Sequence, residues 1–184
     1  MNLWNEIDSL PGGLMKITII YDTLSGHTGK MAQAAAEGAG MVDGIDVIVK
    51  HVDDASAEDL FSEGVIIGSP TYCGLMTWKL KALFDKSQGK AWGKVDGRIG
   101  AAFSSSGGLG GGNELTVFSI LNALMNYGFL VFGLTEYAGK GVTAHYGAVA
   151  VGDPQELELK ACRMLGRKMA EYVSKMFGKS GHGL

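Results

Sequence analysis

The chain has 184 residues and a formal net charge of −3, with 46% hydrophobic and 19% charged residues. These values describe a soluble globular domain with a sizeable core. They exclude a disordered chain, which needs low hydrophobicity and high net charge, and they give no general attraction to nucleic acid. Glycine is abundant, with 29 residues, and proline is scarce, with three, which favours a compact fold with specialised loops.

The sequence gives no sign of export or membrane insertion. Cys73 and Cys162 are far apart and form no CxxC motif, so neither a zinc site nor a disulfide framework is indicated. The first eleven residues lack the basic head and apolar run of a signal peptide. No segment approaches the roughly 18 consecutive apolar residues that would span a membrane. We therefore expect a soluble cytoplasmic protein.

Apolar runs alternate with helical patterns from Lys16 onward. Strands are predicted over 17–21, 47–49, 65–68, 99–104 and 129–132, and the last continues at 148–151 after an interruption over 134–147. Helices are predicted over 28–41, 56–61, 77–86 and 113–126. Ser56 and Asp59 have the spacing of a capping box. Asp153 is predicted to cap a final helix, with Pro154 as its first residue, that ends near Phe177.

This regular alternation of strands and helices indicates an α/β fold. Nearly continuous apolar strands favour a parallel sheet with helices on both faces, and five of them fit a doubly wound sheet of order 2-1-3-4-5. The domain is expected over 15–178, between an N-terminal extension (1–14) and a flexible tail (179–184). The extension has apolar residues at helical spacing, which favours packing on its own domain, with docking on a partner subunit as the alternative.

Ligands of doubly wound sheets bind beyond the carboxyl ends of the strands, so the loops there matter most. After the first strand, residues 23–28 (TLSGHT) lead directly into a helix. Three hydroxyls, a glycine and free backbone N–H groups at a helix start form a site for an anion such as a phosphate monoester. A turn that only caps the helix uses the same residue types. His27 is expected to be a surface or capping side chain, and His51 to be solvated.

Two more loops lie at the same edge. Residues 69–74 (SPTYCG) offer main-chain groups, a phenol and a thiol that suit a planar heterocycle; an ordinary turn is the alternative. Residues 104–112 end with five glycines in six positions. Close approach of a ligand would compensate their folding cost, and a flexible surface loop is the alternative. The dinucleotide pattern GxGxxG fails at Asn113. Together the three loops predict one ligand-binding crevice.

These motifs resemble a known family. The loop 23–28 is similar to the phosphate loop of flavodoxins, and its Gly26-His27 pair is similar to that of the flavodoxin-like NAD(P)H:quinone oxidoreductases, also called the tryptophan-repressor-binding-protein type. The pattern also matches at 68–71, 104–114 and 146–148. The resemblance covers about residues 16–177 and implies a flavodoxin-like fold that binds FMN.

The resemblance also implies roles for single residues. The first loop would hold the FMN phosphate, the second would contact the isoalloxazine ring, and the third would line the other edge of the ring with backbone N–H groups. Asn126 stands where the quinone reductases have a histidine near the flavin, and Trp92 matches a tryptophan that closes over the flavin face. The expected cofactor-binding residues are Thr23, Leu24, Ser25, Gly26, His27, Thr28, Pro70, Thr71, Tyr72, Cys73, Gly74, Ser105, Ser106, Gly107, Gly108, Leu109, Gly110, Gly111 and Asn126.

The resemblance favours one function and leaves a second open. The expected function is an FMN-dependent oxidoreductase that passes electrons from NAD(P)H, as a possible donor, to a quinone-like acceptor. The alternative is a flavodoxin that carries single electrons between redox proteins. The resemblance implies that such carriers have a strongly acidic surface. In this sequence, by contrast, segment 79–98 carries six basic residues. A flavin-free scaffold fits the hydroxyl-rich first loop poorly. We expect a small acceptor or a redox protein as partner, with a homo-dimer or homo-tetramer compatible, and we assign no catalytic side chain and no metal ligand.

Overall fold

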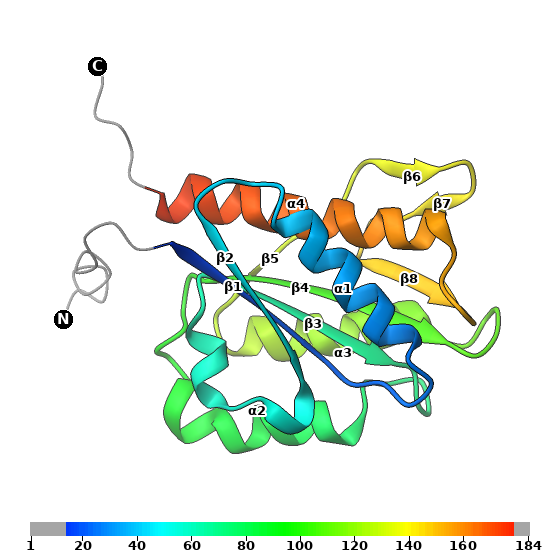
Figure 1. Cartoon of the computed structure of the whole chain (residues 1–184). Coiled ribbons are helices and arrows are strands. Elements are labelled where there is room, and N and C mark those ends of the chain that lie inside the picture. The colour runs from blue at the N-terminus through cyan, green and yellow to red at the C-terminus, as the bar shows by residue number, and fades with distance from the viewer. Residues whose placement is uncertain (1–13, 179–184) are drawn as a thin grey trace.

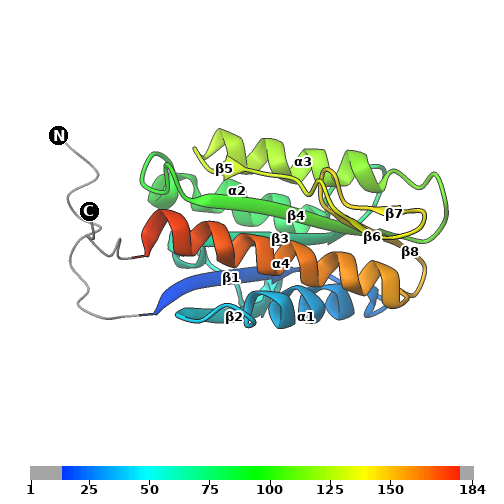
Figure 2. The ribbon, with the colours of Figure 1, turned by 90° about the horizontal axis from the view of Figure 1, so that it is seen from above.

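The computed structural model describes residues 14–178 and shows three layers. A central sheet lies between helices α1 (His27–Ala39) and α4 (Glu156–Phe177) on one face and α2 (Trp78–Ala91) and α3 (Asn113–Asn126) on the other (Figures 1 and 2). Two apolar clusters fill the spaces between these layers. The expected tail at 179–184 lies outside the described residues, as does the extension apart from Leu14.

The central sheet has the predicted strand order. Strands β1 (Met15–Tyr21), β2 (Ile45–His51), β3 (Gly64–Pro70) and β4 (Ile99–Ser106) are parallel neighbours in the order β2-β1-β3-β4. The fifth position is shared by β5 (Leu130–Val131) and β8 (Ala148–Val151), which pair with the two halves of β4. The prediction of an interrupted fifth strand is therefore confirmed. The interruption contains a small antiparallel hairpin, β6 (Tyr137–Gly139) and β7 (Val142–Thr143).

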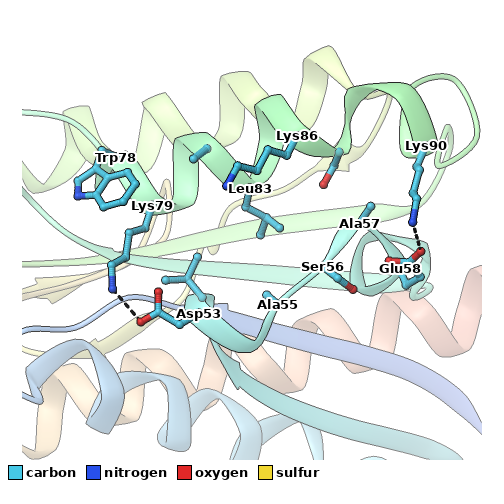
Figure 3. A pocket seen from close by; sticks show the side chains of 13 residues that line it. Asp53, Ala55, Ser56, Ala57, Glu58, Trp78, Lys79, Leu83, Lys86 and Lys90 are labelled. Carbon is cyan, nitrogen blue, oxygen red and sulfur yellow. Dashed lines mark hydrogen bonds and ion pairs between the residues drawn. The ribbon is translucent and has the colours of Figure 1, made fainter.

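The connection between β2 and β3 is shorter and tighter than an α-helix. It consists of two 3₁₀ helices, η2 (Val52–Asp54) and η3 (Ala57–Phe61). The predicted capping box is present, because the Ser56 N–H donates to the Asp59 carboxylate at 2.8 Å. This connection lies against α2, and the two elements line a groove of about 390 Å³ (Figure 3).

The cap of α4 was predicted at the wrong residue. The helix starts at Glu156 with Gln155 as its cap, and the Gln155 N–H donates to the Glu158 carboxylate at 3.1 Å. A glutamate three residues after the cap supplies the reciprocal bond that stabilises a helix start. Asp153 instead accepts a hydrogen bond from Lys30 Nζ at 2.6 Å, so it links the end of β8 to the start of α1.

Backbone contact between α1 and α4 fixes the position of α1. A Cβ atom added at Gly38 would overlap the backbone of Arg163, and one added at Gly166 would overlap the backbone of Ala35. Glycine is therefore needed where these helices cross. Because the N-terminus of α1 forms the end of the first loop, this crossing also positions the helix start at which that loop ends.

No helix within residues 14–178 is long and apolar enough to cross a membrane.

Candidate functional site

The structure brings the three predicted loops together at the carboxyl edge of the sheet. Ser105, near the end of β4, contacts both other loops: its hydroxyl lies 2.8 Å from that of Thr28, and its carbonyl accepts the Thr71 N–H at 2.7 Å. The carbonyl of the next residue, Ser106, accepts a hydrogen bond from the N–H of Gly152, which follows β8, at 2.8 Å. The loops therefore form one connected surface, as the sequence predicted.

The first loop is shaped by its own hydrogen bonds and ends at an uncapped helix. The Thr23 N–H donates to Asp22 Oδ1 at 2.8 Å, and the Gly26 N–H donates to Thr23 Oγ1 at 3.0 Å. Gly26 has a φ of 87°, which turns the chain into α1. No side chain caps α1, and its first turn has no acidic residue. The N–H groups of that turn are therefore available to an anion, and the helix dipole favours one.

Two carboxylates flank this loop: Asp22 lies beside a histidine, and Asp153 is paired with a lysine. Asp22 is 8% exposed and lies 3.4 Å from His51 Nε2. Asp153 is bonded to Lys30, which lowers the pKa of the Asp153 carboxyl, and it lies 3.9 Å from His27 Nε2. These pairings were not predicted, although Asp22 directly follows β1 and Asp153 comes two residues after β8. The expectation that His51 is simply solvated was wrong, because its ring lies between Asp22 and Asp53.

The second loop is a tight hairpin with exposed side chains. Tyr72 and Leu75 exchange two backbone hydrogen bonds of 3.1 Å, and the two residues between them, Cys73 and Gly74, both have positive φ, at 52° and 78°. This is the backbone sign pattern of a type I′ turn, which favours asparagine or glycine and is uncommon for cysteine. Tyr72 and Cys73 project from the turn and are exposed.

The third loop has a buried polar base and an open glycine rim. Asn113, 5% exposed, donates from Nδ2 to Ser106 Oγ at 3.0 Å and to the Ala150 carbonyl at 3.1 Å. Sequence reasoning did not assign this organising role to Asn113. At Gly107 and Gly108 an added Cβ would meet nothing within 4 Å, and neither has a positive φ. Packing and backbone conformation therefore do not require glycine there, whereas close approach of a ligand would.

The residues at this edge fit a ligand with a phosphate and a flat ring. The uncapped start of α1 suits the phosphate. Open glycine backbone and exposed apolar side chains lie around the edge, including Leu24 (86% exposed) and Leu109 (96% exposed). Exposed groups of this size are costly in water, so an apolar ring that covered them would be stabilised. No group of three or more potential metal-ligating side chains occurs within residues 14–178.

Two residues that the resemblance placed near the flavin do not lie at this edge of the sheet. Asn126 is the last residue of α3, and Trp92 follows α2. Because these helices run back from the carboxyl edge, both residues lie toward the amino end of the strands. They line a groove of about 460 Å³ between α2 and α3, whose lining begins at Met76 beside the second loop. Within one copy of the chain, the structure therefore separates Asn126 and Trp92 from the three loops.

Cys162 and Tyr127 have structural roles. Cys162 is fully buried in the core, and burial raises the pKa of its thiol. The Tyr127 hydroxyl donates to the Phe84 carbonyl, and burial raises the pKa of its phenol. Neither group faces the three loops.

The fold and this edge define a class of protein: a doubly wound α/β domain that binds a phosphate-bearing planar cofactor outside its parallel sheet. The family model described as flavodoxin matches residues 19–181. The chain is 55% identical over 161 residues to a protein named flavodoxin from Aquifex aeolicus (strain VF5), covering 86% of this chain and 87% of that one. The chain belongs to the flavodoxin family, whose cofactor is FMN.

Other relatives have a different name. An NAD(P)H dehydrogenase (quinone) from Archaeoglobus fulgidus is 29% identical over 194 residues, covering 89% of this chain and 100% of the relative. Among solved structures, a flavodoxin from the domain Archaea has a TM-score of 0.69 at 25% identity and covers 87% of this chain and 99% of that one. A flavodoxin described as WrbA-like, from Agrobacterium tumefaciens, has a TM-score of 0.68 at 22% identity, covering 88% and 98% of the two chains, and supports the fold alone.

Proposed function

We propose that this protein is an FMN-dependent electron carrier that exchanges electrons with separate redox proteins. The main support is the 55% identity to a protein named flavodoxin across most of both chains. The exposed hairpin at Tyr72–Leu75 adds to this, because a carrier must present the edge of its cofactor to a large partner. FMN supplies the electron-transfer chemistry, and the protein supplies binding, orientation and electrostatics.

In this proposal the first loop holds the phosphate. The first-turn N–H groups of α1 and the hydroxyls of Thr23 and Ser25 donate to the phosphate oxygens. The Thr28 hydroxyl, next to Ser105, supports the loop from beneath. Asp22 and Asp153 would repel a phosphate, but Lys30 pairs with Asp153 and reduces that repulsion. The bound anion is thus stabilised by backbone dipoles more than by a direct cation.

The other two loops hold the ring. The main chain of 70–74 lies along one side, and the backbone N–H groups of 105–111 lie along the other. The glycines at 107 and 108 let the backbone approach closely, because no side chain intervenes. Tyr72 and Leu109 are the exposed groups positioned to cover an apolar face and to exclude water from it.

A second candidate function is transfer of electrons from NAD(P)H to a quinone-like acceptor. The relatives named NAD(P)H dehydrogenase (quinone), at 29% to 33% identity, favour it. Against it, Asn126 and Trp92 lie away from the three loops within one chain. A reductase of this kind would need other groups, or another copy of the chain, to complete its substrate site.

One measurement distinguishes the two functions. FMN-loaded protein is mixed with NADH or NADPH and a soluble quinone, and steady-state oxidation of the nucleotide is followed. A carrier turns over only when a separate flavodoxin reductase is added. Rapid turnover without that reductase would instead establish the second function. The cytoplasmic location and the dimer or tetramer expected from the sequence stay predictions.

A further inference from the structure

Asp22 links β1 to the first loop and helps to shape it. This residue is 8% exposed. Its Oδ1 accepts a hydrogen bond from the Thr23 N–H at 2.8 Å, and Thr23 Oγ1 accepts one from the Gly26 N–H at 3.0 Å. The same carboxylate places a negative charge at the start of the loop to which the FMN phosphate is assigned, and like charges repel most where little water separates them. Asp22 therefore supports the loop through a hydrogen bond and opposes its ligand through charge.

His51 is the basic residue that faces Asp22. It ends β2, where its backbone is paired in register with Tyr21 of β1. Its Nε2 lies 3.4 Å from Asp22 Oδ1, and its Nδ1 lies 3.4 Å from Asp53 Oδ2. Nδ1 also accepts the Asp53 N–H at 3.3 Å, so in the neutral ring the proton sits on Nε2, toward Asp22. A second proton would therefore enter at Nδ1, toward the carboxylate of Asp53.

The other groups around His51 leave Asp22 without a permanent cation as its direct partner. The Tyr21 ring meets the imidazole edge-on, at a centroid distance of 5.5 Å. Lys79 Nζ, from α2, lies 2.8 Å from Asp53 Oδ2 (Figure 3), and this hydrogen bond lowers the pKa of the Asp53 carboxyl. Lys79 acts on Asp22 only from farther away, since within residues 14–178 no lysine or arginine nitrogen lies within 4 Å of the Asp22 carboxylate. Asp22 thus has a charged direct partner only when His51 carries its second proton.

A histidine at this position can respond to the ligand of the first loop. Histidine is the side chain whose charge ordinarily changes between about pH 5 and 8. A phosphate bound in the first loop adds negative charge beside Asp22, which favours the protonated imidazole. The effect is reciprocal, because whatever phosphate binding contributes to the protonation of His51, protonation contributes to the affinity for phosphate. His51 would therefore act on the phosphate without touching it.

We propose that Asp22 and His51 are positioning residues that couple binding of the FMN phosphate to the uptake of one proton by His51. This inference rests on the proposed function, which assigns the phosphate to the first loop, and it adds a regulation of that site by pH. The proton comes from solvent, which reaches the His51 side chain because 27% of it is exposed. It forms an N–H bond at Nδ1, in place of the hydrogen bond from the Asp53 N–H. The imidazolium then offsets the charge of Asp22, which keeps its hydrogen bond to the Thr23 N–H.

The first experiment compares FMN affinity across pH in the parent protein and in His51→Gln. Quenching of FMN fluorescence gives the Kd of each protein from about pH 5.5 to about pH 8.5, the range in which a histidine titrates. The phosphate of FMN also titrates in this range, but that contribution is common to both proteins and cancels in the ratio of their Kd values. Because the variant lacks the imidazolium, we expect it to bind FMN about fivefold more weakly than the parent at the acidic end and equally well at the alkaline end.

Two further variants locate the coupling. Asp22→Asn keeps an oxygen for the Thr23 N–H but removes the negative charge. It should strengthen FMN binding at the alkaline end, where the imidazole of the parent no longer offsets Asp22, and it should remove most of the effect of His51→Gln when the two changes are combined. His145→Gln is the matched control, because its Nδ1 lies 2.9 Å from the Leu134 carbonyl oxygen and, within residues 14–178, no carboxylate oxygen lies within 4 Å of its ring. This control should match the parent at every pH.

A second experiment counts the protons directly. Titration calorimetry in two buffers with different heats of ionisation gives the number of protons that the protein takes up when a ligand binds. With FMN, the parent should take up more protons than His51→Gln, and with riboflavin, which lacks the phosphate, the two proteins should take up the same number. Circular dichroism checks the fold of each variant. If His51→Gln does not fold, the stronger binding expected of Asp22→Asn at the alkaline end still tests the proposal.

The outcomes separate this inference from the proposed function. If FMN does not bind, or binds no better than riboflavin, the assignment of the phosphate to the first loop is itself wrong. If FMN binds better than riboflavin but His51→Gln and His145→Gln give the same pH profile, or the parent and His51→Gln take up the same number of protons, the phosphate site stands and the coupling is wrong. Weaker FMN binding by Asp22→Asn at the alkaline end would also overturn the proposal, because the charge of Asp22 would then help the loop to bind its ligand.

Discussion

The first and second loops occupy the same edge of the sheet but are built in opposite ways. The first (23–28) is bonded to itself, rests on buried Thr28 and ends in a helix fixed by the backbone contact of α1 with α4. The second (69–74) has positive φ at a non-glycine residue, Cys73, and exposes Tyr72; the exposed side chains of Leu75 and Trp78 follow it. A preorganised loop costs little to order on binding. We infer that the first loop supplies cofactor affinity and the second supplies the contact with partners.

The largest expected effect comes from removing the hydroxyls of the first loop. The triple change Thr23→Ala, Ser25→Ala and Thr28→Ala should weaken FMN binding by about 100-fold or more, because hydrogen bonds to a charged group contribute about 1.5–3 kcal/mol each. Quenching of FMN fluorescence measures the affinity, and circular dichroism checks the fold. Thr135→Ala, an exposed hydroxyl far along the chain, is the control. Unchanged affinity in the triple variant would mean that the phosphate does not bind at this loop.

The helix contact behind the first loop is the next test. Gly166→Ala places a methyl group against the backbone of Ala35 and should lower the free energy of unfolding by about 2 kcal/mol, the usual cost of overpacking. Gly89→Ala is the matched control, because its Cβ meets nothing within 4 Å on exposed α2. That change should stabilise the protein by about 0.5–1 kcal/mol through helix propensity. Urea unfolding measures the stability of both variants. Equal effects would mean that α1 and α4 have room to separate.

In the second loop, by contrast, a single substitution should raise the stability of the protein. Cys73→Asn should stabilise the protein by about 0.5 kcal/mol, because asparagine tolerates positive φ better than cysteine. Thermal unfolding of the protein without FMN isolates this effect from binding. Cys73→Val, a β-branched residue in the same conformation, should destabilise it. The same loss of stability in both variants would contradict the turn geometry.

The smallest effect concerns the ion pairs between α2 and the η2–η3 connection. The hydrogen bond from Lys90 lowers the pKa of Glu58 to about 2. Because the folded-state pKa is depressed, the stabilisation is present above the ordinary pKa of 4.5 and is lost as the pH falls toward 2. Glu58→Gln should therefore be slightly less stable than the parent at pH 6 and equal to it near pH 2. The effect is small because both side chains are well exposed. A difference that grows toward pH 2 would contradict this pairing.

Much of the fold was predictable because the signals are local. Apolar strands and the loops after them predicted the sheet order and the meeting of three loops at one edge of the sheet. The cap at Gln155 was missed because Asp153-Pro154 is the stronger local pattern, while Asp153 is used by Lys30, 123 residues earlier in the chain. The Asp22–His51 pair was missed for a similar reason, since it joins the ends of two different strands.

The assignment of Asn126 and Trp92 to the flavin shows a different limit. Both came from resemblance, without reference to topology. A helix that leaves the carboxyl edge of a parallel sheet must return to the amino edge before the next strand, so the ends of α2 and α3 are distant from the loops in any single chain of this fold. The sequence order already contained that constraint. The positive φ at Cys73, in contrast, has no local signal in the sequence.

The most direct test of the account compares two forms of one cofactor. FMN and riboflavin share the ring and differ in the phosphate, so titration calorimetry with both separates the contribution of the first loop from that of the other two. Because the phosphate is assigned to the uncapped start of α1, we predict that FMN binds about 100-fold more tightly than riboflavin or better, an advantage of about 2.7 kcal/mol. Equal affinities would contradict the central claim, because the phosphate would then lie outside the first loop.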